Sequence, residues 1–266
     1  MKKQRPKKHL GQHFLTDSYY AEGIAEAVPA DRGDNVIEIG AGRGDLSIHL
    51  SSLFDNLYMI EKDRDMIPDL RSRVEVDGKR RVVSGDVFDF DFSVFDSFHA
   101  VGNLPYNSAA FIIKRVLWCF PAVKSVTFML QKEVAVRIEQ GPGNRNTGFL
   151  SVFCHYFGTP SILFDIPPGA FHPKPKIYSS VIQIHVDPGK GIRLAPEDRE
   201  VFFGFVSKGF SQRRKKLVNS ISDTPEERSF YTGVLSDMGK SERVRAEEMS
   251  MEEWIEFYLL SKENKG

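Results

Sequence analysis

Between Val36 and Gln131 the sequence alternates short apolar runs with amphipathic stretches, and this pattern restricts the possible folds more than any other feature. Continuous apolar strands are typical of parallel sheets covered on both faces, and the helical periodicity between them predicts crossover helices. The pattern therefore predicts an α/β fold with a parallel sheet. The expected strands are Val36–Ile39, Leu57–Ile60, Arg81–Val83, His99–Val101 and Val126–Leu130.

Two further strands are expected at Ile162–Phe164 and Val181–Val186, separated by a proline-rich loop over residues 166–176. Because this short connection has no helical pattern, the two strands most simply pair antiparallel, as a terminal hairpin of the sheet. Residues 132–157 have a helical pattern, interrupted by the loop Gly141–Asn144.

The last part of the chain, residues 193–266, contains helix starts and no strand pattern. Thr224 and Ser250 are each followed three positions later by a glutamate, which predicts two capping boxes. The final helix is expected to place four apolar side chains on one stripe, namely Trp254, Ile255, Tyr258 and Leu259.

These patterns predict three parts of the chain. A basic arm is expected over residues 1–18, an α/β domain over 19–190 and a small all-α domain over 191–266. The arm is basic because residues 2–8 contain five Lys or Arg and no acid.

Composition limits the classes of partner and site. The 36 Lys plus Arg balance 36 Asp plus Glu, so nucleic-acid binding would need local clusters of positive charge. Cys119 and Cys154 lie in separate apolar segments without a Cys or His pattern, which argues against disulfides and against a metal site. No secretory signal pattern and no apolar run near the ~18 residues of a membrane span occurs, so a cytoplasmic protein without a membrane partner is expected.

A glycine-rich turn follows the first strand, in the segment Glu38-Ile-Gly-Ala-Gly-Arg-Gly44. Glycines allow a backbone to approach a ligand closely, so Gly40 and Gly42 predict a nucleotide cradle at the carboxyl end of a strand. Glu61 closes the next strand, near the ~20-residue spacing expected of a carboxylate that binds ribose hydroxyls.

The spacing of the glycines favours one kind of cofactor. The dinucleotide pattern GxGxxG would need a glycine at position 45, where the chain has Asp45. A carboxylate at the start of the following helix would repel a pyrophosphate, so a cofactor without phosphate, such as S-adenosylmethionine, fits better. Asp86, after the third strand, could contact the adenine of that cofactor, although it could also cap a turn.

The tetrad Asn103-Leu104-Pro105-Tyr106 follows the fourth strand, beside the strand of the glycine turn, where doubly wound sheets bind substrates. With six other segments in the same order along the chain, it resembles the ribosomal RNA adenine N6,N6-dimethyltransferase family, specifically the small-subunit enzyme. The other segments are Lys8–Leu15, Glu38–Gly44, Gln131–Val134, Phe171–Lys176, Phe210–Lys215 and Arg245–Glu248.

The resemblance implies a class I S-adenosylmethionine-dependent methyltransferase fold, Rossmann-like, with a helical C-terminal domain that binds RNA. It implies dimethylation of two adjacent adenosines in the 3′-terminal hairpin of small-subunit (16S) rRNA, on the pre-30S ribosomal particle, by a monomer. It assigns catalysis to Asn103, Leu104, Pro105 and Tyr106, and cofactor binding to His13, Leu15, Gly40, Gly42, Glu61, Asp86 and Asn103. Asn107 is followed by Ser108-Ala109-Ala110 where the family usually has Thr or Ser with Pro, and Ile177-Tyr178 replaces a common Val-Asp. Both departures leave the detailed shape of the substrate pocket open.

The proposed chemistry needs hydrogen-bond acceptors rather than a strong base. The Asn103 oxygen and the Leu104 carbonyl would accept the two N–H bonds of an adenine amine and direct its lone pair at the methyl group. Pro105 would stiffen the turn that presents them. A flipped base would stack on Tyr106 and Phe171, although with 21 phenylalanines in the chain Phe171 could equally belong to the core.

RNA affinity would come from three local clusters of cations. For the cluster at Arg213–Lys215, a solvated helix face is the alternative interpretation. The candidates are Lys7, Lys8, Lys174, Lys176, Arg213, Arg214 and Lys215. Three other functions stay open: the same reaction on large-subunit rRNA, a non-enzymatic RNA-binding assembly or transcription factor, and an NAD(P) oxidoreductase. The glycine spacing argues against the last.

Overall fold

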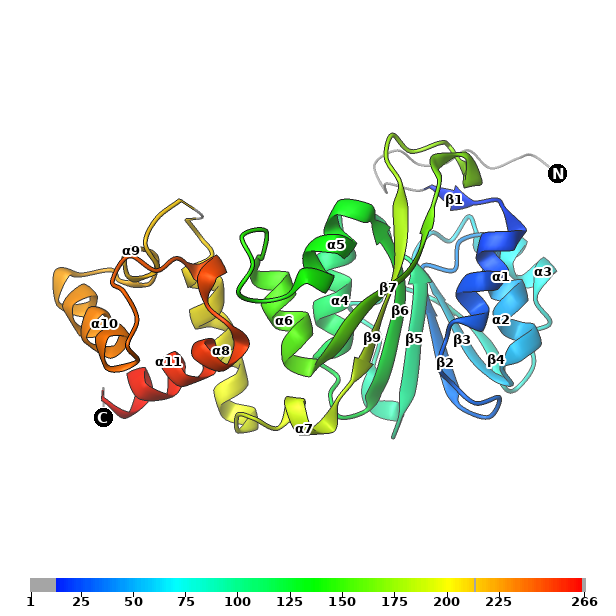
Figure 1. Cartoon of the computed structure of the whole chain (residues 1–266). Coiled ribbons are helices and arrows are strands. Elements are labelled where there is room, and N and C mark those ends of the chain that lie inside the picture. The colour runs from blue at the N-terminus through cyan, green and yellow to red at the C-terminus, as the bar shows by residue number, and fades with distance from the viewer. Residues whose placement is uncertain (1–12, 213, 265–266) are drawn as a thin grey trace. The chain divides into compact units, whose positions relative to one another are not determined.

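The computed structural model describes residues 13–212 and 214–264, and the chain divides into two compact units (Figure 1). The first unit contains the residues up to Val136 together with Gly158–Asp187. The second contains Arg137–Phe157 and the residues from Pro188 onward. In the described residues, no helix is long and apolar enough to cross a membrane.

A seven-stranded mixed sheet forms the centre of the first unit, in the order β4-β3-β2-β5-β6-β9-β7. All seven expected strands are present. They are β2 (Asn35–Ile39), β3 (Asn56–Glu61), β4 (Arg80–Ser84), β5 (Phe98–Asn103), β6 (Val123–Gln131), β7 (Gly158–Ile166) and β9 (Ser179–Val186).

Five neighbouring strands are parallel, while β9 pairs antiparallel with both β6 and β7. This confirms the expected parallel sheet with an antiparallel hairpin at its end. The chain runs outward from β2 to β4 and then returns to β5 on the other side of β2. Such a reversal of strand order opens a crevice at the carboxyl ends of β2 and β5, where open α/β sheets bind ligands.

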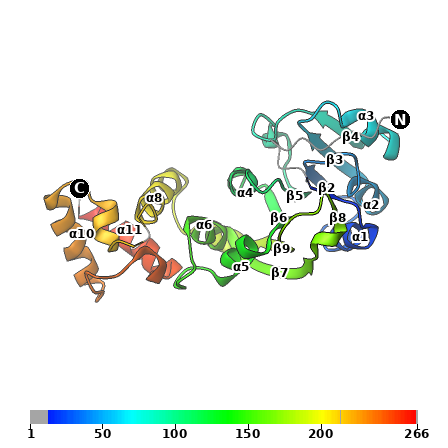
Figure 2. The same ribbon diagram turned by 90° about the horizontal axis from the view of Figure 1, so that it is seen from above.

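Helices cover both faces of this sheet, with α1 and α2 on one face and α4 on the opposite one (Figure 2). The helical elements of the first unit are α1 (Ser18–Glu26), α2 (Ser47–Leu53), α3 (Ile67–Arg73), η2 (Phe92–Val94), α4 (Ala109–Leu117) and η3 (Pro168–Ala170). Helix α5 (Lys132–Gln140) follows β6 and continues into the second unit.

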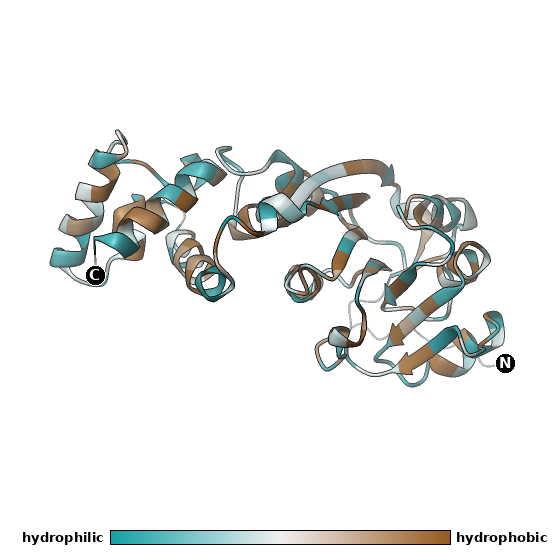
Figure 3. Cartoon of the chain, turned by 90° about the horizontal axis from the view of Figure 1, so that it is seen from below, coloured by the Kyte–Doolittle hydropathy of each residue, from teal (hydrophilic) through white to brown (hydrophobic). Residues whose placement is uncertain are grey.

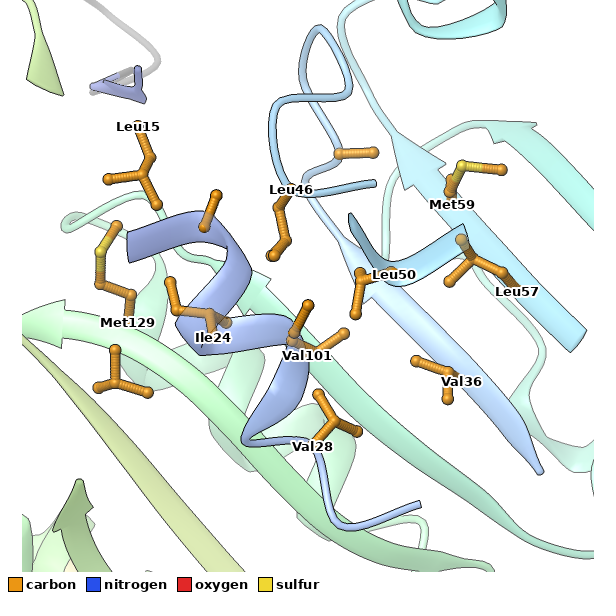
Figure 4. Packing of buried hydrophobic residues seen from close by; sticks show 14 of the residues in the cluster. Leu15, Ile24, Val28, Val36, Leu46, Leu50, Leu57, Met59, Val101 and Met129 are labelled. Carbon is orange, nitrogen blue, oxygen red and sulfur yellow. The ribbon is translucent and has the colours of Figure 1, made fainter. Parts of the chain in front are cut away.

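A hydrophobic core lies between the helices α1 and α2 and the strands β2, β3 and β5 (Figure 4). Ile24 of α1 and Leu50 of α2 are fully buried and point toward the strands that carry Val36, Leu57 and Val101. Burying a side chain of this size contributes about 1.5–3 kcal/mol, so this packing holds α1 and α2 against the sheet.

A two-stranded antiparallel sheet lies outside the expected pattern. It pairs β1 (Phe14–Leu15) with β8 (Phe171–His172), with Leu15 opposite Phe171. Residues 13–18, expected to be part of a basic arm, therefore belong to the fold, because β1 is paired and α1 begins at Ser18. Residues 1–12 of that arm lie outside the described residues.

The second unit is helical, as expected for the C-terminal region, and its helices carry alternating brown and teal segments (Figure 3). Its elements are α6 (Phe149–Phe157), α7 (Pro188–Gly191), α8 (Pro196–Gly209), α9 (Leu217–Ile221), α10 (Pro225–Asp237), η4 (Ala246–Glu248) and α11 (Met251–Glu263).

Helix α6 lies in the second unit rather than in the α/β domain expected over 19–190. The physical reason is aromatic packing: the ring of Phe203 on α8 lies 4.5 Å from the ring of Phe153 and 5.1 Å from that of Tyr156. Rings at these distances stabilise the packing beyond the area they bury.

Two details of the last helices differ from expectation. Ser250 and Glu253 form a complete capping box, whereas at Thr224 the Glu227 carboxylate accepts the amide of Asp223 instead of that of Thr224. The buried stripe of the final helix shares only Trp254 and Tyr258 with the expected one. It consists of Met251, Trp254, Phe257, Tyr258 and Ser261.

Candidate active site

A cavity of about 330 Å³ lies at the carboxyl ends of β2, β3, β4 and β5, within the size range of small-molecule sites. Every expected catalytic and cofactor-binding residue lines it. These residues are His13, Leu15, Gly40, Gly42, Glu61, Asp86, Asn103, Leu104, Pro105 and Tyr106.

Two sides of the cavity differ in chemistry. The acidic side consists of residues 40–43 of the glycine turn and five acids, namely Glu38, Asp45, Glu61, Asp63 and Asp86. The neutral side consists of residues 103–108, after β5, together with His13.

Glu61 ties the glycine turn to the end of β3. Its Oε2 accepts the amide of Gly42 at 2.7 Å and its Oε1 accepts the amide of Asp63 at 2.6 Å. Gly42 has φ of +57°, a conformation that a residue with a Cβ adopts only with strain, so glycine is required for this contact. Burial raises the pKa of Glu61, although hydrogen bonds from the backbone of Asp63, Gly42 and Lys62 lower it. A carboxylate has about four acceptor sites, so Glu61 keeps one for a ligand hydroxyl.

Glu38 is the most deeply buried acid of the cavity, at 2% exposed. The Ser47 hydroxyl at the start of α2 donates to its Oε2 at 2.5 Å. Burial, together with the charges of Glu61 and Asp45, raises the pKa of Glu38 to about 8, against the effect of the Ser47 bond. Glu38 therefore holds a proton at neutral pH, which limits the negative charge packed beneath the glycine turn.

Asp45 stands just before α2 and is neutralised by two arginines. Its carboxylate lies 3.0 Å from Arg43 and 2.6 Å from Arg73. The guanidinium of Arg43 also covers the Phe14 ring at 4.5 Å. This cluster occupies the place where a dinucleotide site would present helix amides to a pyrophosphate.

Asp86 caps a turn at the edge of the cavity. It lines the cavity, accepts the amide of Phe88 at 3.1 Å as a turn cap, and pairs with Lys62 at 2.6 Å. Burial raises the pKa of Asp86, but the bonds from Lys62 and Phe88 outweigh it and leave the pKa below its ordinary value.

On the neutral side, the orientation of the Asn103 amide is set by the segment before α1. Its Nδ2 donates to the backbone carbonyl of His13 at 2.9 Å. Within the described part of the chain, Oδ1 of Asn103 has no hydrogen-bond partner, so an acceptor is left at the cavity wall. Leu104 follows at the same wall and is 1% exposed.

Tyr106 is fixed at both ends. Its hydroxyl is 2.9 Å from that of Ser179 on β9, and its ring stacks on His13 at 5.4 Å. The His13 ring in turn donates from Nδ1 to the carbonyl of Pro173 at 2.7 Å. Burial raises the pKa of Tyr106. The neutral side is therefore a rigid assembly of three distant segments.

Phe171 does not join this assembly, which corrects the expectation that it stacks on a base. Its side chain is 4% exposed, lies in the hydrophobic cluster with Leu15 and Ile166, and does not line the cavity. Pairing of β8 with β1 turns the ring into the core, so the core-packing alternative holds.

The candidate RNA-binding cations that the structure describes are all exposed: Lys174 and Lys176 in the first unit, and Arg214 and Lys215 in the second. Lys7, Lys8 and Arg213 lie outside the described residues. Across residues 13–212 and 214–264, no group of three or more His, Cys, Asp or Glu side chains could hold a metal ion.

The structure adds residues that the sequence reasoning did not select, among them Gly102 and Phe88. A Cβ at Gly102 would overlap with the carbonyl oxygen of Ile39, so glycine lets β5 approach β2 just before Asn103. A glycine inside an apolar strand is a recognisable sign of such close approach. Phe88 lines the cavity although it is 44% exposed, and its only sequence signal is its place after Asp86.

Comparisons with known proteins agree with this geometry. The family model for ribosomal RNA adenine dimethylase matches residues 3–260. A protein of Xanthomonas campestris named ribosomal RNA small subunit methyltransferase A is 38% identical over 94% of both chains. One of the same name from Alkaliphilus oremlandii is 34% identical over 93% of this chain and 88% of its own.

Two crystal structures share the fold. A dimethyladenosine transferase from Plasmodium falciparum has a TM-score of 0.80 at 21% identity, covering 95% of this chain and 98% of its own. The 23S rRNA methyltransferase ErmE has a TM-score of 0.70 at 20% identity, covering 94% and 99%. The match of the family model over nearly the whole length, with relatives above 30% identity, shows that the chain belongs to the ribosomal RNA adenine dimethylase family.

Proposed function

We propose that the protein transfers methyl groups from S-adenosylmethionine to N6 of two adjacent adenosines in the 3′-terminal hairpin of small-subunit rRNA, giving N6,N6-dimethyladenosine on the pre-30S particle. Membership of the family makes it a methyltransferase that dimethylates adenine in ribosomal RNA. The names of the relatives support the small subunit as substrate. The observation that carries the proposal is the Asn103 amide: its nitrogen donates to the His13 carbonyl, and its oxygen, at the cavity, has no partner among the residues that the structure describes.

The acidic side fits S-adenosylmethionine. With Glu38 protonated, four charged acids and two cations, Arg43 and Lys62, line the cavity, so negative charge prevails and suits a positively charged ligand better than a phosphate. Glu61 can accept ribose hydroxyls while it holds the amides of Gly42 and Asp63. The glycine spacing, with Asp45 where the dinucleotide pattern has its third glycine, argues against an NAD(P) enzyme.

The neutral side fits the amine of adenine. That nitrogen is a weak nucleophile because its lone pair is delocalised into the ring. When Asn103 Oδ1 and the Leu104 carbonyl each accept one N–H, the lone pair is directed away from the ring plane. The cofactor supplies an electrophilic methyl group on sulfur, and the two acceptors stabilise the positive charge that develops on N6. A neutral amide cannot keep the released proton, which passes to water.

Tyr106 is the aromatic surface proposed to receive the flipped base. His13 covers one face of its ring, and the bond to Ser179 limits its rotation. Stacking a base on the other face would contribute about 1–3 kcal/mol. The exposed cations Lys174, Lys176, Arg214 and Lys215 are proposed to contact phosphates.

The test is mass spectrometry of ribosomal RNA after incubation of the protein with isotopically labelled S-adenosylmethionine and immature small or large subunits. We expect N6,N6-dimethyladenosine in the small-subunit RNA, confined to two adjacent positions. Label in the large subunit alone would assign the protein to the reaction named for ErmE. Absence of label, together with absence of cofactor binding in calorimetry, would favour a non-enzymatic assembly factor.

A further inference from the structure

The outer face of α4 carries two exposed aromatic side chains beside a lysine. Phe111 is 57% exposed and Trp118 is 43% exposed. Lys114 lies between them in the sequence, with its Nζ 4.8 Å from the centre of the Phe111 ring. Residues three, four and seven apart lie on one face of a helix, so these three side chains form a stripe, named here the α4 stripe.

Folding does not require these rings to be exposed. The opposite face of α4 already supplies the contact with the sheet, through Ile112, Ile113 and Val116, which are at most 4% exposed. Large aromatic side chains that remain accessible next to a ligand cavity are typical of binding surfaces. The contact with Lys114 restricts the Phe111 ring before any ligand is present.

The charge of the surrounding sequence favours a polyanion. No Asp or Glu occurs from Ser97 to Lys132, in a chain with 36 acids among 266 residues. The same interval contains four cations, Lys114, Arg115, Lys124 and Lys132. Arg115 packs over the Phe92 ring and donates to the carbonyl of Phe90, so it supports the neighbouring loop.

The α4 stripe follows directly after the neutral side of the cavity. Asn107, Ser108 and Ile112 line the cavity, and α4 begins at Ala109. At 1.5 Å rise per residue, Trp118 lies about 10 Å further along the helix than Phe111. A strand that delivers one nucleotide to the cavity would therefore meet the two rings in succession.

We propose that the α4 stripe binds single-stranded nucleotides flanking the target adenosine, with bases stacked on Phe111 and Trp118 and a phosphate near Lys114. The inference rests on the proposed function, because it takes the RNA substrate as the occupant. Aromatic rings beside a cation recognise unpaired nucleotides irrespective of their sequence.

The two tryptophans of the chain provide a direct test. Trp118 is exposed, whereas Trp254 is 0% exposed, so a base that stacks on the surface can quench only Trp118. The full-length protein is titrated with a synthetic RNA hairpin of the 3′-terminal small-subunit sequence, and Trp118→Phe is titrated in parallel. We expect saturable quenching in the unsubstituted protein and none in Trp118→Phe. Equal signals in both proteins would overturn the proposal.

Affinity measurements supply the second readout. Phe111→Ala and Lys114→Ala should each weaken binding of the hairpin about tenfold. Tyr19→Ala is the matched control, because Tyr19 is 76% exposed on α1, on the other face of the sheet, and its loss should leave the affinity unchanged. Unchanged affinity in Phe111→Ala would contradict RNA stacking. Quenching of Trp118 by the pre-30S particle but not by the hairpin would also contradict it, and would favour a protein partner instead.

Failure of this inference can be distinguished from failure of the proposed function. All these variants leave the acidic side intact, so binding of S-adenosylmethionine in calorimetry should be unchanged. A protein that binds and uses the cofactor without RNA contact at α4 refutes this inference alone. Loss of cofactor binding by the unsubstituted protein would refute the function instead.

Discussion

The acidic side of the cavity places five carboxylic acids around a glycine turn, whereas the neutral side presents an amide, a backbone carbonyl and two stacked rings. The acids are controlled by local partners: Ser47 for Glu38, backbone amides for Glu61 and arginines for Asp45. The groups of the neutral side are fixed by segments far away in the sequence, as in the bond from Asn103 to His13. Charge therefore selects the cofactor, and rigid neutral acceptors select the reacting amine.

The largest effect is expected at the neutral side. Asn103→Ala removes the acceptor at the cavity wall, and losing one hydrogen bond that acts on the transition state typically lowers kcat by roughly 10²–10³. Cofactor affinity should change only modestly, because Glu61 is untouched. Single-turnover methyl transfer at saturating cofactor measures the first effect and calorimetry the second.

The control for that variant is Asn56→Ala. Asn56 also donates its side-chain amide to a backbone carbonyl, that of Gly33, but it does not line the cavity. Its turnover should equal that of the unsubstituted protein. Near-normal turnover in Asn103→Ala would show that the neutral side does not supply an acceptor needed for the reaction, and the distinction from the acidic side would be lost.

The next effect concerns the acidic side. Glu61→Ala should weaken cofactor binding about 10- to 100-fold, because a charged hydrogen bond contributes about 1.5–3 kcal/mol and the amide of Gly42 also loses its partner. At saturating cofactor, the turnover of Glu61→Ala should approach that of the unsubstituted protein. A large loss of kcat with unchanged cofactor affinity would contradict this assignment.

A smaller effect is expected in the pH dependence of stability. The pKa of Glu38 is raised from 4.5 to about 8, so the folded state retains a proton that the unfolded chain releases. The contribution of this proton to the free energy of unfolding is fully present below about pH 4.5. It is lost as the pH rises toward 8, at no more than ~1.4 kcal/mol per pH unit. Glu38→Gln cannot titrate, so its melting temperature should fall less between pH 5 and 8.5.

Glu75→Gln, at an exposed position, controls for the loss of one acid. Its melting temperatures should follow those of the unsubstituted protein over the same pH range. Identical slopes for Glu38→Gln and Glu75→Gln would show that Glu38 titrates normally.

The smallest effect is expected outside the cavity. Arg214→Glu with Lys215→Glu should weaken RNA binding without changing cofactor affinity, and the salt slope should fall by about one unit for each phosphate that the protein no longer neutralises. The control reverses two other exposed charges of the same unit, Arg228→Glu with Arg243→Glu. Equal RNA affinities in both double variants would favour a solvated surface at residues 214 and 215.

Sequence patterns predicted those features that depend on local periodicity. The seven strands, the antiparallel hairpin and the glycine turn all follow from runs of neighbouring residues. The pairing of β1 with β8 joins strands of two residues each, which are too short for any periodicity to register. The burial of Phe171 depends on that pairing and was therefore missed.

Other features required knowledge of which neighbour covers a face. In α11, apolar residues occur on both sides of the buried stripe, so hydrophobicity alone did not separate Phe257, which is buried, from Leu259, which is 38% exposed. The orientation of the Asn103 amide depends on a carbonyl 90 positions earlier, and no local pattern specifies it.

A crystal structure of the protein with S-adenosylhomocysteine and a short RNA containing the target adenosine would test the central claim most directly. We predict the adenine N6 within about 3 Å of both Asn103 Oδ1 and the Leu104 carbonyl oxygen, with the base against Tyr106. An amine bound elsewhere in the cavity, with Asn103 Oδ1 contacting only solvent, would contradict the account.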